Sequence, residues 1–340
     1  MMKAIASVAV GVIATSLTAT GASAQATLNG VKQKGLLTCG SSSGSVGFGI
    51  PDAQGNWTGL DVDLCRAIAA AIFDDPTKVR FIPLNAKDRF TALQAGEVDV
   101  LSRNSTHTMS RDTQLGLDFP AITYFDGQGF MVRRKLGVSS VRDLNGRSIC
   151  FQQGTTTELN LADYFRANNM KYQSVHFATA DEAKKAYDAG RCDAFTTDIS
   201  GLYVARSWVS NPDEDIVLPE VISKEPLGPV VRHGDNQWGD IVRWVHNAML
   251  NAEELGVTKA NVDQMKTSEN PEIKRLLGTE GKFGEAIGLT NDWAVRIIRH
   301  VGNYGESFER NVSEGSRLKI KRGQNALWTQ GGLQYGIPIR

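Results

Sequence analysis

The chain has 340 residues, of which 41% are hydrophobic and 8% aromatic, a composition typical of globular protein and long enough for about two domains. Lys and Arg together number 37, and Asp and Glu also number 37, so the formal net charge is zero. A balanced charge offers nothing that would recruit a polyanion, and we expect no nucleic acid among the partners.

The N-terminus has the pattern of a secretory signal peptide. Lys3 precedes an apolar run at 4–17, and small residues end at Ala22-Ser23-Ala24, an A-x-A cleavage site before Gln25. The alternative is a membrane-spanning helix, but the run is interrupted by Ser, Thr and Gly and is shorter than the ~20 apolar residues that a bilayer requires. We therefore expect residues 1–24 to be removed and the mature protein to be soluble in the periplasm.

The four cysteines, Cys39, Cys65, Cys150 and Cys192, include no C-x-x-C pair. In an exported chain they favour two disulfides over a metal site, with four buried thiols as the alternative. Three pairings are possible. The local ones, Cys39–Cys65 and Cys150–Cys192, are favoured if the two halves of the chain fold as separate lobes, and each would stabilise the protein by ~3–4 kcal/mol. The five histidines show no ligand spacing, so we expect no metal.

Hydrophobic periodicity predicts the same β-α-β-α-β unit twice. The first unit has strands at 36–42, 79–84 and 98–103 and helices at 59–73 and 88–95. The second unit has strands at 148–153, 174–178 and 192–197 and helices at 155–168 and 180–189. Ala95-Gly96-Glu97-Val98-Asp99 and Ala189-Gly190-Arg191-Cys192-Asp193 close the two units alike, which indicates a duplication with parallel strands.

Two segments that contain Pro and Gly, 118–129 and 224–231, are predicted to cross between two lobes. The domains are then lobe 1 at 25–125, lobe 2 at 126–227, and a return to lobe 1 at 228–340, with helices near 239–254 and 291–304 and an ordered tail from 322. Open parallel sheets bind ligands beyond the carboxyl ends of their strands, so the cleft between the lobes is the expected site.

Polar residues that follow predicted strands are the first candidates for this site. A free amino acid needs a cation for its carboxylate and an anion for its ammonium, and Arg111 and Asp198 suit these roles. Each also fits a structural role, Arg111 as a solvated surface residue and Asp198 as a cap or turn residue. Thr155 and Glu158 have the spacing of a capping box, at a helix start whose free N–H groups would bind an anion, although a plain helix cap explains the spacing by itself.

Together these segments resemble the bacterial family 3 extracellular solute-binding proteins. The resemblance lies in Gly59-Leu60-Asp61-Val62-Asp63-Leu64, in 104–111, in the turn Gln153-Gly154-Thr155-Thr156 and in Thr196-Thr197-Asp198. It implies a type II-like, two-lobe periplasmic binding protein fold with a two-strand hinge. The implied function is that of a monomeric carrier without cofactor or catalytic residues, which delivers its ligand to the membrane permease subunits of an ABC importer. The segment 322–335 is similar to the subgroup that binds many L-amino acids.

The resemblance also implies roles for single residues. The α-carboxylate of the ligand would be held by Arg111, Thr106 and Thr156 with Thr155 beside it, the ammonium by Asn104 and Asp198, and the ligand side chain would be covered by Phe48 or by Ser42 and Ser45. The loop at 85–89, where many relatives have an aromatic residue, carries Lys87 and Arg89, which either contact an acidic ligand or are solvated. His107 either lines the pocket and adds pH dependence or is exposed.

Two other functions fit the same scaffold. One is a periplasmic enzyme such as a cyclohexadienyl dehydratase, which needs a general acid in the cleft, and His107 with Asp198 is the only pair that the sequence offers for it. The other is a sensory module that binds an amino acid and docks on a receptor. Turnover of prephenate or arogenate would identify the enzyme, and uptake measurements would separate the sensor from a transport protein.

Overall fold

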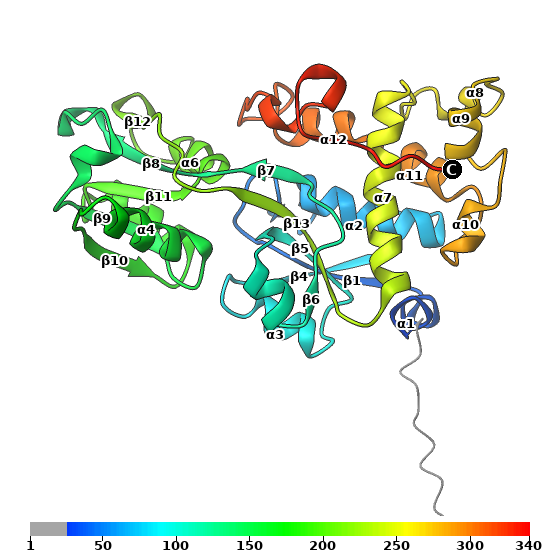
Figure 1. Ribbon diagram of the computed structural model, residues 1–340, viewed down its shortest axis with the longest axis horizontal. Helices are drawn as coiled ribbons and strands as arrows, with labels where there is room; N and C mark the ends of the chain where they lie inside the picture. Colours follow the sequence, from blue (N-terminus) through cyan, green and yellow to red (C-terminus); the bar gives the residue numbers. More distant parts are fainter. Residues whose placement is uncertain (1–25) are drawn as a thin grey trace, which may run out of the picture.

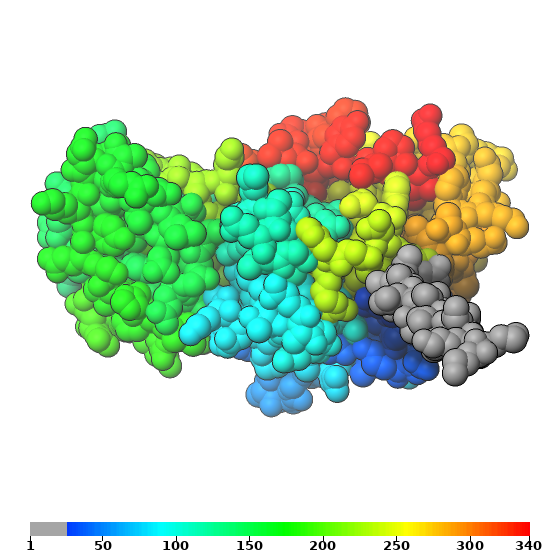
Figure 2. Space-filling view, turned by 60° about the horizontal axis from the view of Figure 1, so that its bottom comes forward, coloured from blue at the N-terminus to red at the C-terminus, as the bar shows by residue number. Residues whose placement is uncertain are grey.

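The computed structural model describes residues 26–340, in which two α/β lobes follow one another along the longest axis of the molecule (Figure 1). The predicted signal peptide, 1–24, lies outside the described residues. Figure 2 shows the second lobe in green and the C-terminal residues in red along the edge of the first lobe. Within residues 26–340, no helix is long and apolar enough to cross a membrane.

The sheet of lobe 1 has the strand order β4-β1-β5-β13-β6, with β7 paired to β13. Its strands are β1 Leu37–Ser41, β4 Val79–Pro83, β5 Val100–Thr106, β6 Leu117–Asp118, β7 Tyr124–Asp126 and β13 Glu225–Arg232. The helices α2 Leu60–Phe73 and α3 Arg89–Gln94 connect the parallel strands β1, β4 and β5, and a short hairpin, β2 Ile50–Pro51 and β3 Trp57–Thr58, precedes α2. The predicted first unit is therefore confirmed.

The sheet of lobe 2 has the order β10-β9-β11-β8-β12. Its elements are β8 Gln128–Arg133, β9 Ser148–Gln152, β10 Gln173–Phe177, β11 Ala194–Asp198, β12 Asp215–Val217, α4 Thr156–Ala167, α5 Ala180–Asp188 and α6 Ile199–Arg206. Strands β9, β10 and β11 are parallel, as the periodicity of the second unit predicts. Strand β8, which directly follows the crossing from lobe 1, pairs antiparallel with β11, and β12 pairs antiparallel with β8.

Both disulfides join cysteines of the same lobe. Cys39 on β1 is bonded to Cys65 on α2, with the Cα atoms 6.3 Å apart, and Cys150 on β9 is bonded to Cys192, with the Cα atoms 5.7 Å apart. The local pairing is confirmed. Neither bond crosses the hinge, so both constrain the unfolded chain without tying one lobe to the other.

The hinge consists of two antiparallel strands. The outgoing chain passes from β7 through Gly127 to β8, and the returning chain enters β13, where Glu225 lies opposite Asp126. The register of β13 against β5 shifts between Gly228 and Val230, around a proline that has no N–H to donate. A Cβ atom on Gly228 would lie 2.0 Å from the carbonyl oxygen of Ala121, so only glycine permits the two crossings to approach this closely.

The chain after the hinge adds helices to lobe 1. They are α7 Asn236–Glu254, α8 Val262–Met265, α9 Pro271–Leu276, α10 Phe283–Ala286, α11 Trp293–His300 and α12 Tyr304–Asn311, and the N-terminal helix α1 Ala26–Lys34 contacts α7. Helices α7 and α11 pack on α2 and form the largest apolar core (Figure 1). The helix predicted near 291–304 corresponds to α11, but its predicted end is wrong, because the chain turns at Gly302, where φ is +93°, and Asn303 caps α12.

The C-terminal tail runs over lobe 1 and holds the outgoing crossing. The buried Asn325 side chain donates to the carbonyl oxygen of Phe125 at 3.0 Å and accepts from its N–H at 2.7 Å, as a neighbouring strand would. The Tyr304 hydroxyl donates to the carbonyl oxygen of Thr123 at 2.8 Å. The Arg322 guanidinium pairs with Glu253 at 3.0 Å and anchors the tail on α7. The tail thus supports the backbone just before the hinge.

We expect Asn325→Ala to lower the free energy of unfolding by about 1–3 kcal/mol, because both backbone groups of Phe125 lose their side-chain partner. Urea denaturation of the mature protein measures this change. Gln330→Ala is the control, since Gln330 is exposed on the same tail. A loss no larger than that of the control would show that the tail does not stabilise the hinge strand.

Candidate functional site

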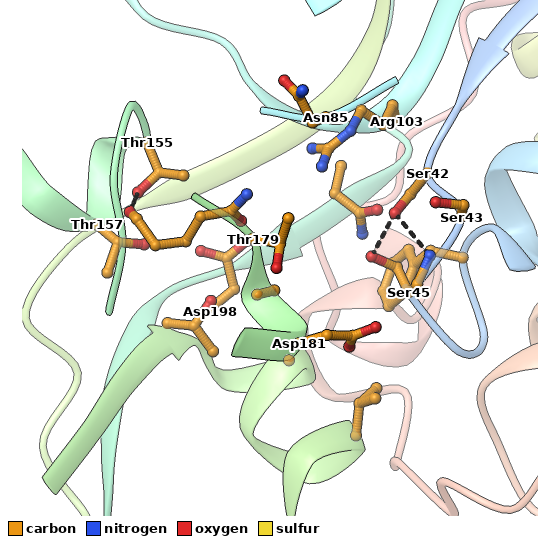
Figure 3. Close-up of a pocket in the computed structure, with 18 of the residues that line it drawn as sticks. Ser42, Ser43, Ser45, Asn85, Arg103, Thr155, Thr157, Thr179, Asp181 and Asp198 are labelled. Carbon is orange, nitrogen blue, oxygen red and sulfur yellow. Dashed lines mark hydrogen bonds between the residues drawn. The ribbon is translucent and has the colours of Figure 1, made fainter. Parts of the chain in front are cut away.

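A cavity of about 410 Å³ lies between the lobes, at the carboxyl ends of the parallel strands (Figure 3). Lobe 1 contributes the loop after β1 and the end of β5, and lobe 2 contributes the starts of α4, α5 and α6. The predicted site residues that line it are Ser42, Ser45, Phe48, Asn104, Thr106, Thr155, Thr156 and Asp198. Only Arg111, among the predicted contacts, is not part of the lining.

Two arginines line the lobe 1 side, namely Arg103, to which the sequence analysis gave no ligand role, and Arg89, which it left open between ligand contact and solvent. Arg103 points into the cavity (Figure 3), and its Nε donates to the carbonyl oxygen of Leu84 at 2.7 Å. Arg89 is buried and donates to the carbonyl oxygens of Arg103 and Asn104 at 3.3 Å each. Burial lowers the pKa of Arg103 to about 10 and lowers that of Arg89 well below its usual range. Burial therefore penalises both charges, and an anion in the cavity would offset this penalty.

Arg111 lies one layer behind the cavity wall. It belongs to a single π-helical turn, Ser110–Gln114, and its Nη1 donates to the carbonyl oxygen of Thr106 at 2.7 Å. Its guanidinium carbon is 5.0 Å from the centre of the Phe90 ring. Burial lowers the pKa of Arg111, and Glu225 and Asp198 counteract this shift. Direct contact between Arg111 and a ligand stays a prediction.

None of these three arginines has a carboxylate within ion-pair distance among residues 26–340. Asp198, on the lobe 2 side, likewise has no cation within that distance in the described part of the chain. It begins α6, but its side chain makes no cap hydrogen bond. The interpretation of Asp198 as an ordinary cap is therefore wrong, and its carboxylate is available to a ligand.

Asp198 belongs to a group of three carboxylates at the hinge, with Asp126 and Glu225. Burial, with the charges of Asp126 and Glu225, raises the pKa of Asp198 well above its usual range. Burial also raises the pKa of Asp126 to about 6. Since Asp126 and Glu225 face each other across the two hinge strands, like charges are concentrated here. A cation bound at Asp198 would reduce this repulsion.

The sequence analysis did not find Glu225, which accounts for much of the hydrogen bonding at the hinge. Its buried carboxylate accepts from the hydroxyls of Thr106 at 2.6 Å and Thr156 at 2.9 Å, from Asn160 at 2.6 Å and from Ser223 at 2.6 Å. It connects lobe 1, through Thr106, with α4 of lobe 2. Each threonine hydroxyl has one proton, and here that proton goes to Glu225, so only the backbone of these threonines remains free to donate to a ligand.

The predicted capping box at the start of α4 is wrong. The Thr155 hydroxyl donates to the carbonyl oxygen of Gln152 at 2.8 Å instead of accepting from the first turn (Figure 3), while Glu158 accepts from the N–H of Gly154 at 2.9 Å. Helix α4 therefore begins without a side-chain cap, beside the cavity that Thr155 and Thr156 line. The uncapped N–H groups and the positive end of the helix dipole favour an anion there.

Asn104 contributes a polar atom that lacks a partner. Its backbone is held at φ +38°, with its N–H donating to Asp61 of the Gly-Leu-Asp-Val-Asp-Leu segment at 2.9 Å. Its side-chain oxygen is buried and has no hydrogen-bond partner in the described structure. Such an acceptor is costly unless a donor reaches it, and an ammonium in the cavity is such a donor.

Lobe 1 also contributes the loop after β1, which carries Ser42, Ser45 and Phe48. The hydroxyls of Ser42 and Ser45 are 3.0 Å apart (Figure 3), and the buried Phe48 ring meets Tyr124 edge to face at 5.0 Å. Small hydroxyls and one aromatic ring accommodate side chains of several kinds.

The positions that the sequence left open are now assigned. Arg89 lines the cavity, whereas Lys87 and His107 are not among the lining residues. The His107 ring stacks on Phe119 at 4.5 Å, and its nearest acidic partner is Asp112 at 3.9 Å. The pair of His107 and Asp198 that an enzyme would need is therefore not formed. In residues 26–340, no group of His, Cys, Asp and Glu is arranged to hold a metal ion.

Comparison with known proteins identifies relatives over the whole chain. The general L-amino acid-binding periplasmic protein of Rhizobium johnstonii is 59% identical over 100% of both chains. The glutamate/glutamine/aspartate/asparagine-binding protein of Rhodobacter capsulatus is 55% identical over 97% of this chain and 98% of its own. A periplasmic binding protein of Brucella ovis, solved with glutathione bound, is 62% identical, with a TM-score of 0.90 over 92% of this chain and 99% of its own.

These relatives are binding proteins, which sets the enzyme hypothesis aside. The sequence profile of the bacterial extracellular solute-binding proteins, family 3, matches residues 37–264, about two thirds of the chain. That range covers both lobes and every residue named at the cavity. The chain belongs to the family 3 bacterial extracellular solute-binding proteins.

Proposed function

We propose that this protein is a periplasmic carrier that binds free L-amino acids between its lobes and delivers them to the membrane permease of an ABC importer. One observation carries the proposal. Arginines without carboxylate partners and an aspartate without a cationic partner border the same cavity, within the described residues. An α-amino acid supplies both missing charges on one carbon atom, whereas a sugar would leave both unpaired.

The proposed contacts follow from these charges. The α-carboxylate is held by Arg111 or Arg103 and by the uncapped start of α4, and the ammonium is held by Asp198 and the side-chain oxygen of Asn104. Arg111 reaches the ligand if its hydrogen bond to Thr106 is given up on closure. The broad ligand range of the relatives supports a broad range here, because the contacts involve only groups that all amino acids share.

Closure of the lobes is part of this proposal. Each charged group of the ligand contacts both lobes, so the ligand stabilises an arrangement in which the lobes are close together. The two-strand hinge, with no disulfide across it, permits this motion. The permease then distinguishes the closed protein from the open one. The predicted signal peptide and the periplasmic relatives support the location.

Calorimetric titration of ligand-stripped mature protein tests the proposed function. We expect several L-amino acids to bind with a Kd near or below about 1 μM, equivalent to about −8.2 kcal/mol, and sugars and prephenate not to bind. Loss of amino-acid uptake on deletion of the gene would separate a carrier from a sensor. Binding of prephenate alone, or of no amino acid, would contradict the proposal.

We expect Asp198→Asn to weaken L-amino acid binding by about 2–5 kcal/mol, because the ammonium loses its proposed counter-charge. Asp163→Asn is the matched control, since Asp163 is an exposed aspartate of the same lobe. Calorimetry measures both variants. Equal affinities for the two variants would remove Asp198 from the site.

Arg111→Ala is expected to weaken binding by about 2–5 kcal/mol if the guanidinium reaches the ligand carboxylate on closure. The control is Arg142→Ala, at an exposed position of lobe 2. A loss smaller than about tenfold, or 1.4 kcal/mol, would assign Arg111 a supporting role behind Thr106 and leave Arg103 as the carboxylate ligand.

Amino-acid affinity is expected to rise with pH. Burial raises the pKa of Asp198, so its carboxyl holds a proton to higher pH than an ordinary aspartate does, while the ammonium pairs with the ionised form, so binding expels protons. Affinity should therefore increase with pH over the range in which Asp198 ionises in the free protein. Titrations in buffers of different ionisation enthalpy count the released protons. Affinity independent of pH, without proton release, would contradict a neutralised Asp198.

A further inference from the structure

The ligand cavity continues into a second chamber of about 320 Å³. The two chambers share Ser43 and Gly44 from the lobe 1 loop and Asp181 and Lys184 from α5, so they meet between the lobes. A Cβ atom on Gly44 would lie 3.6 Å from a carboxylate oxygen of Asp181, so any larger residue at 44 would narrow the connection. In the proposed function, the α-ammonium and α-carboxylate of the ligand lie in the first chamber.

The second chamber has a mixed lining. Its apolar part comes from Val46 and Ile50 of lobe 1 and from Ala205, Trp208 and Val209 at and after the end of α6. Besides Asp181 and Lys184, its charged part includes the exposed Lys185 and Asp188, and the Asp188 carboxylate accepts hydrogen bonds from Ser210 at 2.9 and 3.0 Å. Trp208 is 61% exposed, an unusually open position for so large an apolar side chain. An indole face beside an opening between two lobes can cover the extended chain of a ligand.

Lys184 and Asp181 form an ion pair where the two chambers meet. Lys184 Nζ lies 2.7 Å from Asp181 and 5.8 Å from the centre of the Trp208 ring. The Lys184 side chain is 17% exposed and that of Asp181 is 57% exposed. Because Lys184 is the better shielded of the two, an anion that enters the chamber gains more from the ammonium than a cation gains from the solvated carboxylate.

We propose that the second chamber is a subsite for the distal part of an elongated ligand, a short peptide or γ-linked amino acid whose far carboxylate pairs with Lys184. The inference rests on the proposed function, since the first chamber must hold the α-ammonium and α-carboxylate of the same molecule. The chain of the ligand passes Gly44 and lies against Trp208. Asp181, being largely exposed, keeps its hydration when Lys184 turns to the ligand.

Three related ligands test this subsite by calorimetry. L-Glutamate fills the first chamber, γ-L-glutamylglycine adds a distal carboxylate, and γ-L-glutamylglycinamide has the same length without that charge. We expect the wild-type protein to bind the dipeptide at least about tenfold more tightly than its amide. In Lys184→Met the dipeptide should lose at least about tenfold in affinity relative to its amide, with an unchanged urea midpoint as a check on folding. Lys171→Met, at an exposed lysine of lobe 2, is the control and should change neither.

The outcomes are distinct. A protein that binds L-amino acids but not the dipeptide, or that binds dipeptide and amide equally in both the wild type and Lys184→Met, overturns the subsite and leaves the proposed function standing. A protein that binds no L-amino acid overturns the proposed function itself. A second variant, Trp208→Ala, should weaken the dipeptide and its amide alike, because both lose the apolar cover while the charge of Lys184 remains.

Discussion

The central feature of this structure is a cavity bordered by charged side chains that have no ion-pair partner in the described part of the chain. Arg89 and Arg103 border the cavity from lobe 1, and Asp198 borders it from lobe 2, without ion-pair partners among residues 26–340. Removing such groups from water costs free energy unless a counter-charge arrives. A ligand that carries both charges offsets this desolvation free energy on both lobes, and it can do so only when the lobes are close together. The same unpaired charges therefore favour both ligand binding and closure of the lobes.

The hinge connects the two lobes through hydrogen bonds at the cavity. Glu225 accepts hydrogen bonds from Thr106 of lobe 1 and from Thr156 and Asn160 of lobe 2, so the returning strand is bonded to both sides of the cavity. Asp126 lies opposite it on the outgoing strand, which the tail residue Asn325 holds in place. The disulfides remain within single lobes. The two strands at the crossing are therefore the place where we expect the lobes to move relative to each other.

The parts of this structure that depend on local or repeated patterns could be predicted from the sequence. The two β-α-β-α-β units, the crossings and the local cysteine pairing follow from periodicity and spacing, and Asp198 was found because it ends a strand. Glu225 could not be found, since its partners lie 119, 69 and 65 residues away in the chain. Arg103 was not assigned to the ligand, because its burial depends on how the lobes pack.

Two local predictions were wrong for local reasons. Thr155 has the spacing of a capping residue, but its hydroxyl bonds the carbonyl oxygen of Gln152, which leaves the start of α4 open. The sequence pattern at 291–304 predicts a helix over the whole segment, but the chain turns at the positive φ of Gly302 and α11 ends at His300. In the first case the departure from the rule occurs at the ligand cavity, as is common where a site needs free backbone groups.

The most direct test of the central claim is to remove each charge from the ligand instead of from the protein. Calorimetry would compare the best-bound L-amino acid with its N-acetyl derivative and its α-amide. We predict that each loses at least about thirtyfold in affinity, equivalent to about 2 kcal/mol, because a buried charge of the protein is left unpaired. If either derivative bound as tightly as the amino acid, the unpaired charges around the cavity would not be what holds the ligand.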